Sequence, residues 1–190
     1  MLAPLLSLLL LAQPAPTQSA PAQSAAPAPV VAEAQRLIRQ QRYNDAINRL
    51  EIHLEASPQD GEAMAFLGAA HLYAERETTR AREVFEASFA AGGGASFWVN
   101  HSHQTVLDGD DLTDYCRGWL NLRRGYVEFA PEEGDHGFRL TYAEVAEFKQ
   151  NRNKAFFHIK RGGKNQNFRP RSADQRETLL LLILFNKFSR

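Results

Sequence analysis

Cysteine is almost absent from the sequence, because Cys116 is the only one among 190 residues. An intramolecular disulfide is therefore excluded, although small exported proteins often depend on several. The folded part must be held together by hydrophobic cores instead. A lone cysteine near Tyr115 and Trp119 is typical of a small buried apolar side chain. We therefore expect Cys116 to be part of a core rather than a nucleophile.

An excess of charge of one sign is also missing. Lys+Arg and Asp+Glu number 22 each, whereas a nucleic-acid-binding domain usually carries a basic excess. No nucleic-acid partner is therefore expected. Long hydrophobic runs are missing too, since the apolar run Leu179–Phe185 is far shorter than the roughly 20 residues that a membrane-spanning helix needs.

The familiar sequence signatures of enzymes are not present. The chain has no glycine-rich phosphate loop, no nucleophile-elbow serine and no zinc-protease helix motif. We therefore expect a protein that is not an enzyme and that needs no cofactor.

The N-terminal segment has the texture of an export signal. A short hydrophobic stretch over 5–11 is followed by small residues, as a signal-peptidase site requires. We predict a signal peptide over 1–20, a Pro/Ala-rich linker over 21–29 and an exported protein, which is periplasmic, secreted or envelope-associated. No Lys or Arg precedes the hydrophobic stretch, so an apolar N-terminus without a signal function is the alternative.

Helical periodicity begins at Val30 and continues to residue 92. Small, large and small residues recur at a constant offset between two predicted helix pairs: Ala46, Leu50 and His53 align with Ala81, Phe85 and Ser88. With Leu67–Gly68 and Pro58, this pattern resembles the tetratricopeptide repeat (TPR), whose period is about 34 residues. Glu33–Ala34 departs from the pattern. The resemblance implies antiparallel helix pairs, and unrelated helical hairpins are the alternative.

From residue 96 the periodicity changes to that of β-strands. Alternating apolar residues with glycine turns predict antiparallel hairpins. An apolar helix that begins with a capping box at Ser172 and Gln175 is predicted to close the chain. The segments GWLNLRRGYVEF, FRLTYAEVAEFK and AFFHIKRGGKNQNFRP, with this helix, resemble the pleckstrin-homology (PH) superfold over 96–190. The expected class is thus α+β: TPR-like helix pairs over 30–92, then a small antiparallel β-barrel or roll capped by a helix.

Two histidines have a spacing that suits metal ligands. His101 and His103 share one face of a predicted strand, and Cys116 or His158 could be a third donor. No carboxylate that would orient them is identifiable from the sequence. Polar residues on a solvent-facing strand face are the favoured explanation of the pattern, so no metal site is assigned. A metal-dependent sensor or enzyme that uses His101, His103 and Cys116 is kept as an alternative.

Two charged stretches invite functional interpretations. The aspartates of 108–114 do not have the glycine and closing glutamate of a calcium loop, and we predict a solvated loop. The basic stretch 149–171, with Lys160, Arg161 and Lys164 around a predicted turn, could contact acidic lipid headgroups or another acidic surface. Lysine and arginine that keep a hairpin soluble are the alternative.

These features together predict a non-enzymatic adaptor or scaffold that binds a protein or peptide. A TPR-like groove is expected to supply polar contacts from Arg39, Arg42, Asn48 and Tyr73, and the basic hairpin is expected to supply a second surface. A purely structural role, with dimerisation through the apolar final helix, is the other alternative. The sequence leaves the oligomeric state open.

Overall fold

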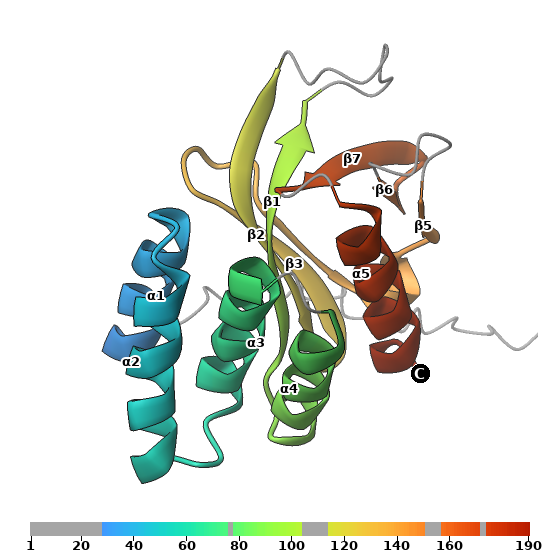
Figure 1. Cartoon of the computed structure of the whole chain (residues 1–190). Helices are drawn as coiled ribbons and strands as arrows, with labels where there is room; N and C mark the ends of the chain where they lie inside the picture. The colour runs from blue at the N-terminus through green and yellow to red at the C-terminus, as the bar shows by residue number, and fades with distance from the viewer. Residues whose placement is uncertain (1–27, 76–77, 104–113, 151–156, 172–173) are drawn as a thin grey trace, which may run out of the picture.

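The computed structural model describes residues 28–75, 78–103, 114–150, 157–171 and 174–190, which form five α-helices and seven β-strands (Figure 1). The α+β class is therefore confirmed. The predicted signal peptide, most of the linker and most of the acidic stretch 108–114 lie outside the described residues.

Four helices occupy the N-terminal half: α1 (Pro29–Arg39), α2 (Tyr43–Ala56), α3 (Gly61–Glu75) and α4 (Thr78–Ala90). Asp60 begins α3 by accepting a hydrogen bond from the Ala63 backbone N–H at 3.0 Å. Consecutive helices pack against one another. A Cβ on Gly68 would lie 2.6 Å from the ring of Phe85, so this glycine is what allows α3 and α4 to approach so closely.

The strands form one antiparallel sheet in the order β4-β3-β2-β1-β7-β6-β5. Their bounds are β1 (Gly94–Ser102), β2 (Tyr115–Arg123), β3 (Tyr126–Pro131), β4 (Phe138–Thr141), β5 (Glu147–Gln150), β6 (Phe157–Arg161) and β7 (Lys164–Pro170). The edge strands β4 and β5 share no ladder in the described chain. The sheet is thus not closed, so of the expected barrel or roll the closed form is excluded, and the expected antiparallel sheet with a C-terminal helix is confirmed.

The last helix, α5 (Gln175–Phe188), packs against α4 and against strands β2, β5 and β7. Its N-cap is Asp174, which accepts from the Arg176 backbone N–H at 2.8 Å, so the expected cap at residue 172 is wrong by two positions. Leu181 is fully buried, whereas Leu179 and Ile183 remain 54% and 41% exposed. None of the described helices combines the length and the apolar character needed to cross a membrane.

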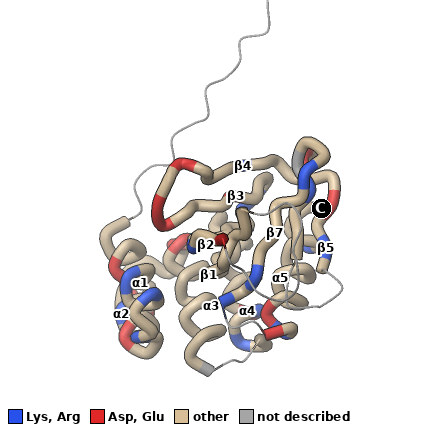
Figure 2. Tube along the Cα trace, turned by 90° about the horizontal axis from the view of Figure 1, so that it is seen from above, with Lys and Arg blue, Asp and Glu red and all other residues tan. Residues whose placement is uncertain are grey.

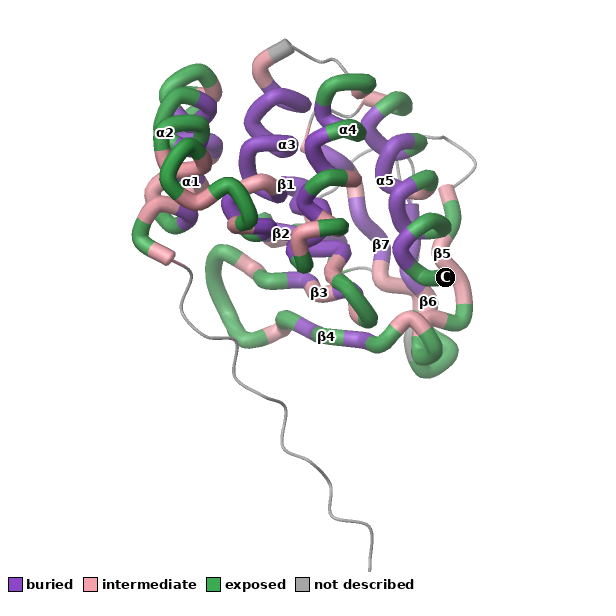
Figure 3. Tube along the Cα trace, turned by 90° about the horizontal axis from the view of Figure 1, so that it is seen from below, coloured by how far each residue is buried: buried purple, intermediate pink, exposed green. Residues whose placement is uncertain are grey.

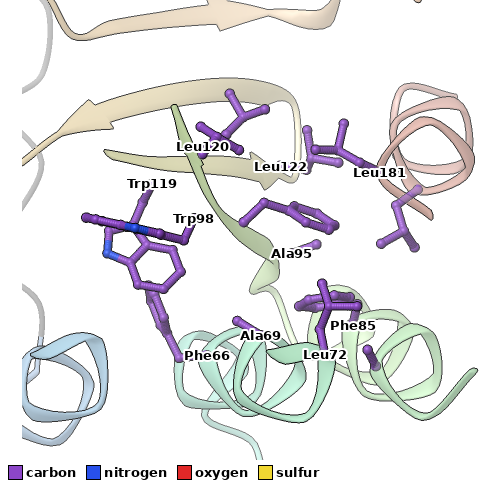
Figure 4. Packing of buried hydrophobic residues seen from close by; sticks show 14 of the residues in the cluster. Phe66, Ala69, Leu72, Phe85, Ala95, Trp98, Trp119, Leu120, Leu122 and Leu181 are labelled. Carbon is purple, nitrogen blue, oxygen red and sulfur yellow. The ribbon is translucent and has the colours of Figure 1, made fainter. Parts of the chain in front are cut away.

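Helices and sheet share one continuous hydrophobic core. The ring of Phe85 on α4 lies 5.3 Å from that of Phe97 on β1, and Phe66 on α3 meets Trp119 on β2 edge-on at 4.9 Å. Figure 4 shows Phe66, Phe85 and Trp119 between the helices and the strands. Figure 3 shows that α3 is buried along much of its length, whereas α2 is largely exposed.

A buried tyrosine connects three elements within this core. The Tyr73 hydroxyl on α3 donates to the Glu177 carboxylate of α5 at 3.0 Å and accepts from the backbone N–H of Trp98 on β1 at 2.7 Å. Tyr73 is only 9% exposed. Its hydroxyl therefore holds α3, β1 and α5 together and is not available as the partner contact expected from the sequence.

Replacement of this hydroxyl is expected to be costly. Tyr73→Phe leaves the buried Trp98 N–H without its side-chain acceptor, which typically costs about 1–3 kcal/mol of unfolding free energy. Urea denaturation of the variant measures the loss. Tyr43→Phe is the matched control, because the Tyr43 ring packs on Tyr73 at 5.9 Å while its own hydroxyl has no partner in the described chain. Equal stabilities of the two variants would contradict the role of the Tyr73 hydroxyl.

Candidate metal centre

Four potential metal ligands converge at one end of the sheet. His101, His103, Cys116 and His136 each offer a donor atom, and all four atoms lie within 4.8 Å of one another. Ligands around a tetrahedral zinc ion bind at about 2.0–2.3 Å, so their donor atoms are about 3.5 Å apart. Small side-chain movements would therefore close the group around an ion. We call these four residues the His/Cys cluster.

Strand pairing explains three members of the His/Cys cluster. His101 and Cys116 are directly opposed in the β1–β2 ladder, and His103 lies on the same face of the chain two residues after His101. The ladder continues past the strand end, because the His103 backbone N–H donates to the Asp114 carbonyl at 3.1 Å. The antiparallel pairing thus brings residues of two strands to one point.

The connection between β3 and β4 supplies the fourth member. Gly134 has a positive φ of 85°, and a Cβ there would lie 2.9 Å from Nδ1 of His136. A glycine is therefore required for the turn that returns His136 toward β2. His136 Nε2 lies 2.7 Å from the sulfur of Cys116.

Two polar side chains orient the histidine rings. Gln166 Oε1 on β7 lies 3.2 Å from His101 Nε2. The opposite ring nitrogen, Nδ1, is 3.7 Å from the Cys116 sulfur. Asp114 Oδ1 lies 2.9 Å from Nδ1 of His103, which leaves Nε2 of His103 to face a ligand. A hydrogen bond to the far nitrogen fixes the tautomer and raises the basicity of a metal-binding histidine. The carboxylate that the sequence did not reveal is thus Asp114.

Burial sets the protonation of the His/Cys cluster. His101 packs between Phe129 and Phe168, with ring centroids 4.9 and 4.8 Å away, and burial lowers the pKa of His101 to about 4. His101 is therefore a neutral imidazole, the form that binds metal, at neutral pH. Burial, with a smaller effect of Asp114, raises the pKa of the Cys116 thiol. Without a metal the thiol keeps its proton, so a metal ion must displace it.

His136 is the functional residue that the sequence analysis missed. The β2–β3 hairpin contained the signal, because its register pairs Gly118 with Pro131. The pairing extends further, since the Glu132 backbone N–H donates to the Arg117 carbonyl at 2.7 Å. Counting the register outward from the turn at Arg124–Gly125 puts Cys116 opposite Glu133, three residues before His136.

His158, the other donor considered from the sequence, does not join the His/Cys cluster. It is buried on β6, and its Nε2 lies 3.1 Å from Glu147 Oε2 on β5. Hydrogen bonds from Lys149 and then His158 lower the pKa of Glu147 to about 2. His158 thus serves the β5–β6 pairing. Cys116 is half-buried: it packs against the hydrophobic core, as expected, while its sulfur lies beside histidines.

The residues expected to contact a partner are spread over the molecule. Arg39 on α1 forms an ion pair with Glu132 at 3.3 Å and borders a hollow between α1, α3 and the sheet. Arg42 pairs with Asp45 at 2.6 Å, and Asn48 is exposed on α2. Of the four residues expected to supply polar contacts, Tyr73 alone is buried.

The basic hairpin is described in part. Lys160 and Lys164 flank the β6–β7 turn, where Gly162 and Gly163 have positive φ. The side chain of Arg161 and residues 151–156 lie outside the described part. Figure 2 shows Lys and Arg interspersed with Asp and Glu on the trace, including along α1 and α2.

Comparisons with known proteins add little to this geometry. No protein-family model and no curated protein matches the chain. Among solved structures, the N-terminal PH domain of human ARAP2 is similar, with a TM-score of 0.37, 9% identity and coverage of 50% of this chain and 76% of that one. The C-terminal domain of an unknown protein from Leishmania infantum has a TM-score of 0.35, 18% identity and coverage of 55% and 96%. At these TM-scores the function has to be argued from the chain's own residues.

Proposed function

We propose that this protein binds a divalent transition-metal ion, zinc by preference, through the His/Cys cluster. The observation that carries the proposal is the convergence of four donor atoms within 4.8 Å from two strands and a loop. Hydrogen bonds from the far ring nitrogens to the oxygens of Gln166 and Asp114 support it, because such contacts are what orient metal-binding histidines.

The donor set favours zinc over calcium or magnesium. Three imidazoles and a thiolate are the ligand types of zinc and of other late transition metals, whereas calcium and magnesium prefer oxygen. Four protein donors complete a tetrahedral shell, and a complete shell leaves no open position for a substrate. The metal function is therefore binding or sensing rather than catalysis. His103, with a side chain 36% exposed, gives solvent access, which allows the ion to exchange.

Metal content tests the proposal directly. The full chain, stripped with a chelator and dialysed against micromolar free zinc, is expected to retain about one zinc ion per molecule, measured by plasma mass spectrometry. His136→Ala is expected to lose most of it. His136 lies on a half-exposed loop, so this change spares the core. His158→Gln is the matched control and is expected to keep its zinc, since His158 contacts Glu147 instead.

Either of two results would contradict the proposal. One is wild-type protein that retains no zinc, nickel or copper after this treatment. The other is His136→Ala protein that retains as much metal as the wild type while its circular dichroism shows it folded.

A second candidate function is the non-enzymatic, protein-binding adaptor expected from the sequence. The specific observation in its favour is the hollow of about 610 Å³ that Arg39 borders together with residues of α3, β2 and β3, since pockets of this size are typical of ligand sites. A TPR-like arrangement of α1–α4 and an acidic partner for the hairpin at Lys160, Arg161 and Lys164 belong to this candidate. Export, predicted from residues 1–20, would place both functions outside the cytoplasm.

A further inference from the structure

The hollow between the helices and the sheet has a floor made by alternate residues of three paired strands. The ladders oppose Trp98 to Trp119, Asn121 to Glu128 and Arg123 to Tyr126. All of these residues therefore share one face of the sheet. Phe66 and Glu62 of α3 and Arg39 of α1 form the opposite wall. Figure 4 shows Phe66, Trp98 and Trp119 side by side in this region.

Three residues that follow one another on this face of β2, Trp119, Asn121 and Arg123, are hydrogen-bond donors, and none of the three is fully satisfied within the described chain. Trp119 is 5% exposed, and its indole N–H is buried without a partner. Asn121 accepts from the Ser96 hydroxyl through Oδ1 at 2.8 Å, and no described residue accepts from its amide nitrogen. A buried donor without an acceptor costs about 1–3 kcal/mol. This arrangement is unfavourable unless something in the hollow accepts the bond.

Arg123 adds a positive charge to the same row. Its guanidinium donates to Ser96 at 3.2 Å, and burial lowers the pKa of Arg123. No carboxylate of the described chain comes within ion-pair distance of it. A largely buried arginine normally has an anionic partner, and here the space beside it is the hollow.

The acidic residues around the hollow are mostly neutralised. Glu128 accepts from Arg139 at 2.7 Å, and Glu132 pairs with Arg39 at 3.3 Å. Arg123 on the floor and Glu62 on the opposite wall are the two charged lining residues that no described ion pair neutralises. Arg123 attracts an anionic group next to the Trp119 and Asn121 donors, while Glu62 disfavours a ligand that carries several negative charges. Aromatic side chains on both walls favour a ligand with an apolar group next to its anionic group.

We propose that this hollow binds an organic monocarboxylate, with its carboxylate oxygens on Arg123 and Asn121 and an acceptor on the Trp119 indole N–H. A peptide C-terminus and a free aromatic acid share this chemistry. The site shares no residue with the His/Cys cluster, so it goes beyond metal binding, and it gives the second candidate function a defined ligand chemistry.

Fluorescence titration of the full chain tests the proposal, because both tryptophans of the chain line the hollow. The probes are N-acetylphenylalanine, its amide and phenylacetate. N-acetylphenylalanine is expected to bind at least about tenfold more tightly than the amide, since hydrogen bonds to charged groups contribute about 1.5–3 kcal/mol. Arg123→Gln is expected to abolish this preference, and Arg124→Gln, a change at the exposed neighbour, is expected to retain it.

The variants and probes separate the outcomes. Trp119→Phe keeps an aromatic ring but removes the indole N–H and part of the ring, and Trp98 remains as the fluorophore. Loss of the preference for acid over amide in this folded variant supports the proposal even where Arg123→Gln fails to fold. Binding of phenylacetate without binding of N-acetylphenylalanine would support a carboxylate site for free acids. It would contradict the adaptor function, because N-acetylphenylalanine represents a peptide C-terminus. Equal affinity for acid and amide, or no binding of either acid at millimolar concentration, would overturn the proposal. The titration is carried out with and without zinc, so that failure of ligand binding in the hollow can be distinguished from failure of metal binding by the His/Cys cluster.

Discussion

Zinc affinity is expected to weaken by at least about tenfold for each unit that the pH falls below neutrality, and Cys116→Ala is expected to weaken it at least about 100-fold. Burial raises the pKa of the Cys116 thiol, so metal binding must release its proton, and a lower pH opposes that release. His101 contributes no proton at these values, because burial lowers its pKa to about 4. Replacement of a residue that only orients a ligand typically costs about 10–100-fold, and loss of a donor costs more.

Calorimetric titration in buffers of different ionisation enthalpy measures both the affinity and the number of protons released. The wild type is expected to release about one proton more than Cys116→Ala at pH 7. Gln166→Ala removes the contact to His101 Nε2. This variant is expected to weaken zinc affinity by about 10–100-fold, the typical effect of losing a residue that only orients a ligand. Identical proton release by wild type and Cys116→Ala would show that the thiol is not a ligand.

Phe97→Ala is expected to destabilise helices and sheet together by about 3–5 kcal/mol. Phe97 on β1 is fully buried and contacts Phe85 of α4 at 5.3 Å, so its loss leaves a cavity between the two halves of the chain. Because stabilities of domains of this size are about 5–15 kcal/mol, the variant is expected to lie close to its unfolding threshold.

Two probes show whether the halves unfold together. Far-UV circular dichroism follows the helices, and fluorescence follows Trp98 on β1 and Trp119 on β2. Since the core is continuous, the two signals are expected to share one midpoint in urea without zinc, in the wild type and in Phe97→Ala. Ile52→Ala on α2, where Ile52 is 62% exposed, is the control and is expected to change stability by less than about 0.5 kcal/mol. Two separate midpoints would show that the halves are independent domains.

The sequence pattern was sufficient where a structure depends on neighbours along the chain. The helical periodicity from Val30, the proline and glycine positions and the alternation from residue 96 predicted the α+β class and the order of helices and strands. The start of α5 was placed at Ser172 instead of Asp174, because both residues can cap a helix and the sequence does not show which of them does. The choice between barrel and roll stayed open because closure depends on pairing between edge strands that are distant in sequence, and periodicity does not report such pairing.

The candidate site shows the same division. His101, His103 and Cys116 were recognised from residue type and spacing, and Tyr73 was placed on a surface because its helical position alone did not show which neighbour would cover it. The residue types in the sequence determined which side chains could act as metal donors, as cations or as apolar contacts. The tertiary structure alone decided which of them meet: His136 rather than His158 beside Cys116, and Trp119, Asn121 and Arg123 beneath one hollow. Contact between distant segments depends on strand register, loop reach and the burial that the whole core makes favourable.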